Sequence, residues 1–226
     1  MTVAPDPLPP RAPSRLSRAA ALFTAGPVST VASVLLAVIV ISAILAPWIV
    51  PHDPMRLVPS MRLKPPGDGY LLGTDAYGRD LFSRLVYGAR ISLVIGIGAA
   101  IAATAIGLAV GLMAGFFRRL DAVLMRVVDG LMAIPNILLA IAIVSLSGAS
   151  LTTVLIAITI PEVPRVVRLV RSVVLSAREE PYVEAAIAAG SSTPRILIRH
   201  LLPNTIAPLI VQGTYICASA ILVEAI

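Results

Sequence analysis

Few side chains in this sequence combine a reactive group with the spacing that enzyme chemistry requires. Lys64 is the only lysine, and it follows Met-Arg-Leu instead of the Gly-x-x-x-x-Gly that precedes a phosphate-binding lysine. The histidines, His52 and His200, are far apart and belong to no metal-ligand pair. Cys217 lies in an apolar run, where a thiol is usually a packing residue. We therefore expect no covalent chemistry, no cofactor and no metal: the protein is not an enzyme.

One carboxylate stands out because of its surroundings. Glu162 lies about midway along the apolar run 151–169, between Pro161 and Pro164, which each remove a helical hydrogen bond. A carboxylate at membrane depth is costly and normally faces a cavity or a partner. The sequence therefore allows two readings of Glu162: a place along a solute pathway, or a local ion pair with Arg165.

A polar passage, "EAAIAAGSSTPRILIRHLLPN" at 184–204, interrupts two strongly apolar stretches. Its pattern predicts a helix over 178–189 that Gly190 stops, followed by a short helix that Thr193 caps, Pro194 opens and Pro203 ends. Two short helices joined by a glycine turn have the build of a docking element. The alternative is that the passage only ties two helices together, although a mere connection is expected to be shorter.

The composition is that of a membrane protein. Of the 226 residues 58% are hydrophobic and 13% charged, and the mean hydropathy is +0.93. The net charge of +6 does not point to nucleic acid, because aromatic residues make up only 4% and the arginines sit between apolar runs. We predict an all-α, multi-pass protein with five transmembrane helices, over residues 28–50, 91–117, 131–146, 151–169 and 204–226.

The distribution of arginines predicts the orientation of these spans. Basic residues in the tail 1–27, between the second and third spans and in residues 165–203 place those segments, and thus the N-terminus, in the cytoplasm. Residues 51–90 are then external, although they too carry basic residues. Within them we predict an interfacial helix over 71–90, capped by Thr74, with the i,i+4 ion pairs Asp75–Arg79 and Asp80–Arg84. This helix either fixes the entry angle of the second span or contacts an external partner.

Small residues recur every fourth position along the second predicted span. On one helical face they would let another helix approach closely, so we expect this face to pack against protein, although chance in an Ala/Gly-rich helix is the alternative. The residues are Ala99, Ala103, Gly107, Gly111 and Gly115.

Three segments together resemble a known family. "EAAIAAG" followed by "LLP" resembles the EAA loop of bacterial ABC importer permeases, and His200, where the general pattern has isoleucine, resembles the variant of the dipeptide, oligopeptide and nickel group. "LGTDAYGRDLFSRLVYGARISL" and "MRVVDGLMAIPNILLAIAIV" are similar to the second type of permease subunit in that group.

The resemblance implies a type I permease fold in the bacterial inner membrane, in contact with lipid, that moves dipeptides, oligopeptides or nickel chelates. It also implies four partner chains, namely a homologous permease subunit, two ABC ATPase subunits and an external solute-binding protein. The residues that would contact the ATPases are Glu184, Ala185, Ala186 and Gly190, with Leu202 and Pro203 closing the motif.

The family fold has six spans, so with five we expect a permease that lacks its C-terminal part. Two other classes remain as alternatives. An ion-gradient carrier would need no ATPase, and an intramembrane enzyme would need a nucleophile and base or a metal pair, which the sequence does not show.

Overall fold

The computed structural model describes residues 26–67 and 69–225, so the predicted N-terminal tail lies almost wholly outside the described residues. Throughout that described part the regular structure is helical, apart from two isolated bridges, Gly67 with Tyr70 and Thr74 with Asp80. The predicted all-α class is confirmed. The chain divides into two compact units, Met1–Arg90 and Ile91–Ile226, and each is considered by itself.

The first unit begins with the apolar helix α2 (Pro27–Ile44), followed directly by the single turn α3 (Ala46–Ile49). Together they cover the predicted span 28–50. The break falls at Leu45 because Pro47 has no N–H to donate to the carbonyl of Ala43. Most side chains of α2 are exposed in the isolated chain, as expected for a helix whose surroundings are lipid.

A long loop with the short 3₁₀ turn η1 (Pro59–Met61) leads from α3 to α4 (Leu81–Phe116). The predicted helix over 71–90 is wrong in its first half, because residues 71–80 form turns. Gly73 and Gly78 take φ values of +77° and +74° there, which a right-handed helix cannot contain. From Leu81 onward the helix is continuous for 36 residues, so no separate interfacial helix precedes the second predicted span.

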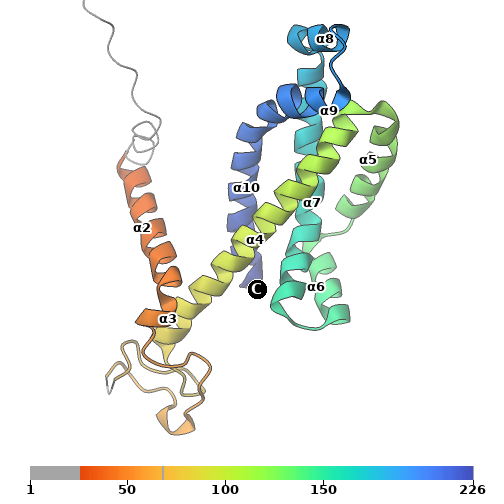
Figure 1. The fold of residues 1–226 in the computed structure, drawn as a ribbon. Helices are drawn as coiled ribbons and strands as arrows, with labels where there is room; N and C mark the ends of the chain where they lie inside the picture. Colours follow the sequence, from red (N-terminus) through yellow and green to blue (C-terminus); the bar gives the residue numbers. More distant parts are fainter. Residues whose placement is uncertain (1–25, 68, 226) are drawn as a thin grey trace, which may run out of the picture. The chain divides into compact units, whose positions relative to one another are not determined.

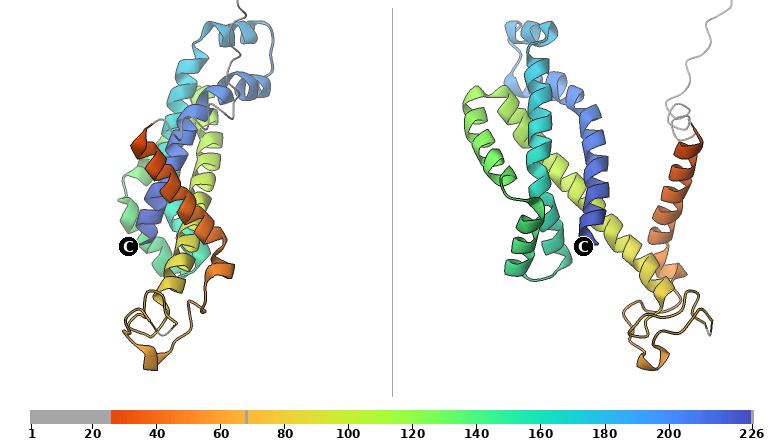
Figure 2. Two further views of the ribbon diagram at one scale, coloured as in Figure 1. Left: turned by 90° about the vertical axis from the view of Figure 1, so that its left-hand side faces the viewer. Right: turned by 180° about the vertical axis from the view of Figure 1, so that it is seen from behind.

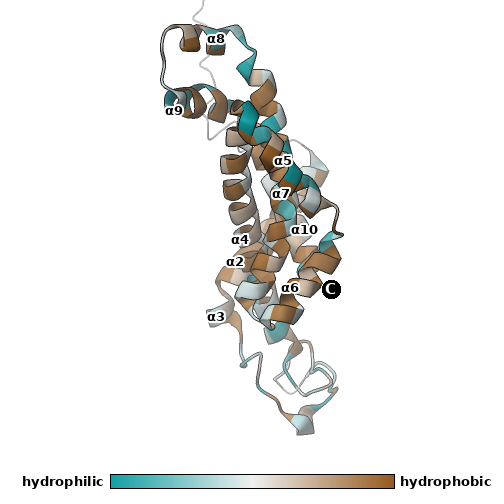
Figure 3. Ribbon diagram, turned by 90° about the vertical axis from the view of Figure 1, so that its right-hand side faces the viewer, coloured by the Kyte–Doolittle hydropathy of each residue, from teal (hydrophilic) through white to brown (hydrophobic). Residues whose placement is uncertain are grey.

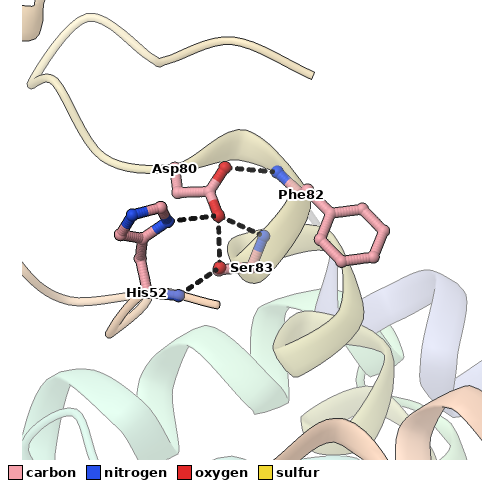
Figure 4. A network of polar contacts seen from close by, with 4 residues as sticks. All are labelled: His52, Asp80, Phe82 and Ser83. Carbon is pink, nitrogen blue, oxygen red and sulfur yellow. Dashed lines mark hydrogen bonds and ion pairs between the residues drawn. The ribbon is translucent and has the colours of Figure 1, made fainter. Parts of the chain in front are cut away.

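Asp80, and not Thr74, caps α4. Its Oδ1 accepts the N–H of Phe82 at 3.3 Å and its Oδ2 accepts the N–H of Ser83 at 3.3 Å (Figure 4). The same carboxylate lies 3.4 Å from Nδ1 of His52 and accepts the Ser83 hydroxyl. The predicted partners also change: Asp75 pairs with Arg84 instead of Arg79, since the turn brings the start of α4 back to it.

In the second unit, α7 (Leu151–Arg178) is the central element. It contacts α5 (Arg118–Met132), α6 (Asn136–Ser147) and α10 (Leu202–Glu224), and the 91–116 part of α4 also packs against it (Figures 1 and 2). A line of valines on α7, namely Val166, Val170 and Val174, is fully buried in the main core.

The small residues of α4 face this line of valines. A Cβ added at Gly111 would lie 2.6 Å from the Cβ of Val170, and one added at Gly115 would lie 2.6 Å from the Cβ of Val174. Gly107 meets Val166 in the same way, and Ala103 is fully buried one turn earlier. The two backbones therefore approach so closely that no side chain fits between them.

By length and apolar character, three of the described helices could cross a membrane: Pro27–Ile44, Leu81–Phe116 and Thr193–Glu224. The pair α5 and α6, bent by 84° at Pro135, would make a fourth if it were one broken span. The predicted span 151–169 does not qualify by this criterion because Glu162, Arg165 and Arg168 fall within it. Five spans thus remain a prediction.

Candidate docking hairpin

The polar passage folds as a hairpin at one end of α7 (Figures 1 and 2). Its first arm, α8 (Pro181–Ala188), starts later than predicted because α7 itself runs on to Arg178. Pro181 occupies the first turn, where a missing N–H costs nothing. Val183 anchors the arm: it is completely buried, in the same core as Val174.

The turn after α8 has the hydrogen bonds of a Schellman motif. The Ser191 N–H donates to the Ala186 carbonyl at 3.0 Å, and the Gly190 N–H donates to the Ile187 carbonyl at 2.9 Å. Gly190 takes φ +76°, which is unfavourable for any residue with a Cβ, although there is open space around it. The helix therefore ends where the sequence predicts, and the glycine is required by backbone geometry.

The second arm differs from its prediction. α9 (Thr193–Ile196) includes Thr193 as its first residue, and the preceding Ser192 makes no side-chain capping bond. Pro203 does not end a helix either: the π-helical turn η2 (Leu197–Leu201) joins α9 to α10, and Pro203 lies in the first turn of α10. Because Pro203 has no N–H for the carbonyl four residues earlier, a wider turn replaces the α-helical one.

The hairpin presents some predicted residues to solvent and buries others partly. Glu184, Ala185, Gly190 and Pro203 are exposed, whereas Ala186 and Leu202 are half-buried. The structure thus places all six on or beside one hairpin. Sequence reasoning missed the residues that hold the hairpin in place, which are the buried Val183, Ile196 and Leu201.

A polar contact ties the two ends of the hairpin together. The Asn204 side-chain N–H group donates to the Tyr182 hydroxyl at 2.8 Å and to the His200 carbonyl at 2.7 Å. The His200 ring lies 6.1 Å from the Tyr182 ring, in a tilted arrangement. The motif "HLLPN" thus contributes Asn204 as a clamp, a role that its position just after Pro203 did not reveal.

Ion pairs fasten α5 to α7 next to the hairpin. Arg171 makes a bidentate pair with Asp121, with Nη2 2.6 Å from Oδ2, and Arg168 pairs with Asp129. The Arg171 hydrogen bond holds the pKa of the Asp121 carboxyl below its usual range, against the opposing effect of burial. Figure 3 shows hydrophilic residues gathered where α5 meets α7. Sequence reasoning did not identify these pairs, because their partners are 39 to 50 residues apart.

The end of α4 is tied to α7 as well. Nη1 of Arg178 lies 3.4 Å from the carbonyls of both Gly115 and Phe116, so a guanidinium satisfies the last carbonyls of α4. Arg178 thus links the last turn of α7 to the end of α4.

Glu162 lies in the first half of α7, farther from the hairpin, and is 6% exposed. Its Oε1 and Oε2 lie 3.2 Å and 3.4 Å from Nη1 of Arg165, so the local pair is formed.

Apolar helices that carry a polar hairpin at one end are the architecture of a helical membrane protein. Residues 107–225 match the family described as "Binding-protein-dependent transport system inner membrane component", and residues 14–66 match "N-terminal TM domain of oligopeptide transport permease C". The chain belongs to the family of binding-protein-dependent inner membrane transport components.

Named relatives agree with this family. A probable peptide ABC transporter permease protein of Sinorhizobium fredii is 51% identical over 76% of this chain and 60% of its own length. A dipeptide transport system permease protein of Alkalihalophilus pseudofirmus is 46% identical over 81% and 60%. A probable D,D-dipeptide transport system permease protein of Escherichia coli is 35% identical over 90% and 69%. The chain thus spans about two thirds of the length of these relatives or somewhat less.

Proposed function

We propose that this chain is a membrane-spanning permease subunit of an ATP-driven importer that moves dipeptides or short oligopeptides across the bacterial inner membrane, with its N-terminus in the cytoplasm. The names of the relatives support peptides as the substrate class. The chain works with a homologous permease subunit, two ABC ATPase subunits that hydrolyse ATP, and an external solute-binding protein.

The observation that carries the proposal is the construction of the hairpin. The first arm exposes Glu184 and Ala185 and the turn exposes Gly190, while Val183 of the same arm is buried in the protein core. An exposed surface that includes the small residues Ala185 and Gly190 fits a groove on a partner, and the buried Val183 passes the partner's movement into the core around α7. From α7 the closely packed glycines and the ion pairs carry that movement to α4 and α5.

Transport by the assembled complex tests this proposal. The chain would be reconstituted into liposomes with its permease partner, the ATPases and the binding protein, and peptide uptake and ATP hydrolysis would be measured together. Glu184→Ala should lower uptake per ATP hydrolysed severalfold. Glu179→Ala is the matched control, because Glu179 is also exposed but precedes α8. Equal coupling in wild type and Glu184→Ala would contradict the docking role.

The same preparation separates the proposal from an ion-gradient carrier. Without the ATPase subunits, uptake should cease. Uptake that persists under an ion gradient alone would assign the chain to the other transport class.

Glu162 is proposed as a residue along the solute pathway. The position of Glu162 supports this proposal, because burying a carboxylate near the middle of an apolar helix is costly. Among the described residues, Arg165 is its one ion-pair partner.

A further inference from the structure

The loop between α3 and α4 holds a leucine in a conformation that leucine rarely adopts. Leu63 has φ +52°, and among the described residues it alone takes positive φ without being glycine. A side chain with a Cβ is unfavourable in this left-handed region. Its side chain is 65% exposed, so core burial does not compensate for the strain. Strained positions of this kind persist where the surroundings impose them, and they cluster at functional sites.

Hydrogen bonds to residues 74 and 75 hold Leu63 at this positive φ. The Leu63 N–H donates to the Asp75 carbonyl at 3.1 Å, the Lys64 N–H donates to the Thr74 hydroxyl at 2.9 Å, and the Thr74 N–H donates to the Lys64 carbonyl at 3.0 Å. Thr74 is buried, and Gly73 leaves no room for a Cβ against the Lys64 carbonyl. The backbone of the segment that contains Leu63 is thus fixed to residues 73–75, and the Leu63 side chain projects from it exposed.

Basic residues flank this leucine in the chain. Arg62 and Lys64 flank it directly, and Arg56 lies seven positions earlier; all three are exposed. None of the three forms an ion pair with any residue that the structure describes. We call Arg62, Leu63 and Lys64 the Leu63 knob.

Two nearby carboxylates are engaged within the loop and cannot neutralise the knob. Asp75 pairs with Arg84 and accepts the N–H groups of Tyr77 and Arg79, while Asp80 is buried against His52 and Ser83 (Figure 4). The surface left to a partner is therefore an exposed apolar side chain on a fixed backbone, between two cations that form no ion pair with the described residues.

The place of the knob selects the kind of partner. Within the first unit, the loop extends past α3, away from the apolar helix α2 (Figures 1 and 2). A helix that spans lipid and a loop that extends beyond its end place the loop in the aqueous phase. A leucine on a fixed backbone is a suitable anchor for a protein pocket, because little backbone conformational entropy is lost when it binds.

We propose that the Leu63 knob is the docking point for the external solute-binding protein, which receives Leu63 in an apolar pocket rimmed by carboxylates. The inference rests on the proposed function, because it takes residues 51–80 as external. It adds the residues that make the contact and the chemistry of the surface that they contact.

Binding to the complete transporter in lipid nanodiscs tests the inference, with the solute-binding protein of the same transporter as the probe. Asn and Gly adopt positive φ more readily than leucine, so Leu63→Asn and Leu63→Gly should keep the loop intact while they remove the apolar side chain. Both should raise Kd about tenfold, as loss of an anchor residue does. Leu71→Asn is the matched control: Leu71 belongs to the same loop and is 64% exposed.

The cations should affect the rate of association. Arg62→Gln and Lys64→Gln should lower the association rate constant and make it less dependent on salt, because long-range attraction to an acidic surface steers the encounter. Association rates that stay unchanged in both variants would contradict a carboxylate-rimmed pocket.

The outcomes separate this inference from the proposed function. If the wild-type complex binds the solute-binding protein and Leu63→Asn and Leu63→Gly bind equally well, the docking point is wrong and the importer stands. If the wild-type complex does not bind it at all, both proposals fall.

Lipid is the alternative occupant, and a fluorophore distinguishes it. The label would sit on a cysteine in place of the exposed Ser60, with Cys217 replaced by serine. A blue shift on addition of the solute-binding protein supports the inference. A blue shift in anionic nanodiscs without that protein would assign the knob to the membrane surface and overturn it.

Discussion

Gly111 on α4 and Val170 on α7 lie so close that a Cβ added to the glycine would be 2.6 Å from the Cβ of the valine and 2.9 Å from the Val167 carbonyl. The second obstacle is backbone, so a rotamer change in Val170 cannot make room. The same relation recurs one helical turn further on, at Gly115 and Val174. The α4–α7 contact is therefore a close backbone packing that runs along successive turns.

Gly111→Ala should destabilise the protein by about 1–3 kcal/mol, because the added methyl group forces α4 and α7 apart. The thermal unfolding midpoint in detergent would measure the loss. Gly130→Ala in α5 is the control: no atom lies within 4 Å of its added Cβ, and alanine favours a helix. Equal midpoints for Gly111→Ala and the wild type would show that the contact is loose.

Acid should weaken the link between α5 and α7. The folded-state pKa of Asp121 is lowered, first by its hydrogen bond to Arg171. A lowered pKa means that the carboxylate stabilises the fold above its unfolded value of 3.8 and loses this effect as pH falls through the folded pKa. The stability difference between wild type and Asp121→Asn should therefore be constant near neutral pH and shrink below about pH 4.

Unfolding midpoints of both proteins across that range would check the effect. Asp129→Asn is the comparison, because the side chains of Arg168 and Asp129 are 48% and 59% exposed and such a pair contributes about 0–1 kcal/mol. A gap between wild type and Asp121→Asn that stays constant into the acid range would contradict the assignment.

Gly190→Ala should separate the structural role of the hairpin from its functional role. Gly190 has φ +76° and Gly148 has φ +78°, and both have open space around them, so alanine at either should cost about 1–2 kcal/mol. Only Gly190 lies in the hairpin proposed to dock on the ATPase. Both variants should show similar unfolding midpoints, and Gly190→Ala alone should lower peptide uptake per ATP hydrolysed. Similar loss of coupling in both would point to general destabilisation.

Arg165→Gln should cost more stability than the loss of both partners. The substitution leaves the Glu162 carboxylate buried without its cation, so we expect the free energy of unfolding to fall by about 2–3 kcal/mol. This loss is below the usual one for a broken buried pair because the Arg165 side chain is 38% exposed. The double variant Glu162→Gln, Arg165→Gln should regain most of this loss. Additive losses in the double-mutant cycle would mean that the two side chains do not interact.

Glu162→Gln tests the pathway proposal separately. The amide keeps the shape of the side chain and removes its charge, so uptake of charged peptides should fall or change in preference. Full uptake with an unchanged range of peptides would leave Glu162 with only its structural pair.

Where local chemistry decides the structure, the sequence was a good guide. Gly190 ends α8 because the positive φ of a Schellman turn favours a residue without a Cβ. The apolar run near the N-terminus forms α2, and the four-residue spacing of small residues places them on one side of α4. Each of these outcomes depends on neighbours within a turn or two of helix.

Predictions from the sequence were wrong at several helix boundaries, and they did not include the contacts between distant segments. The pattern at 71–80 suits a helix, yet the backbone of residues 73–75 bonds to that of residues 63 and 64, and Asp80 becomes the cap. Thr193 was expected to cap and instead begins α9, and Pro203 was expected to end a helix and instead lies within one. At residues 71–80, hydrogen bonds to a remote segment outweighed local preference.

By itself the sequence determined that this chain is an all-helical membrane protein with a polar hairpin that resembles the EAA loop, because composition and glycine chemistry act locally. Tertiary structure decided what each feature contacts: that the glycines of α4 meet the valines of α7, that Asp121 meets Arg171, and that Leu63 is fixed in a strained, exposed position. These contacts depend on which residues distant in the chain come within a few ångströms, and no pattern along the chain encodes that distance directly.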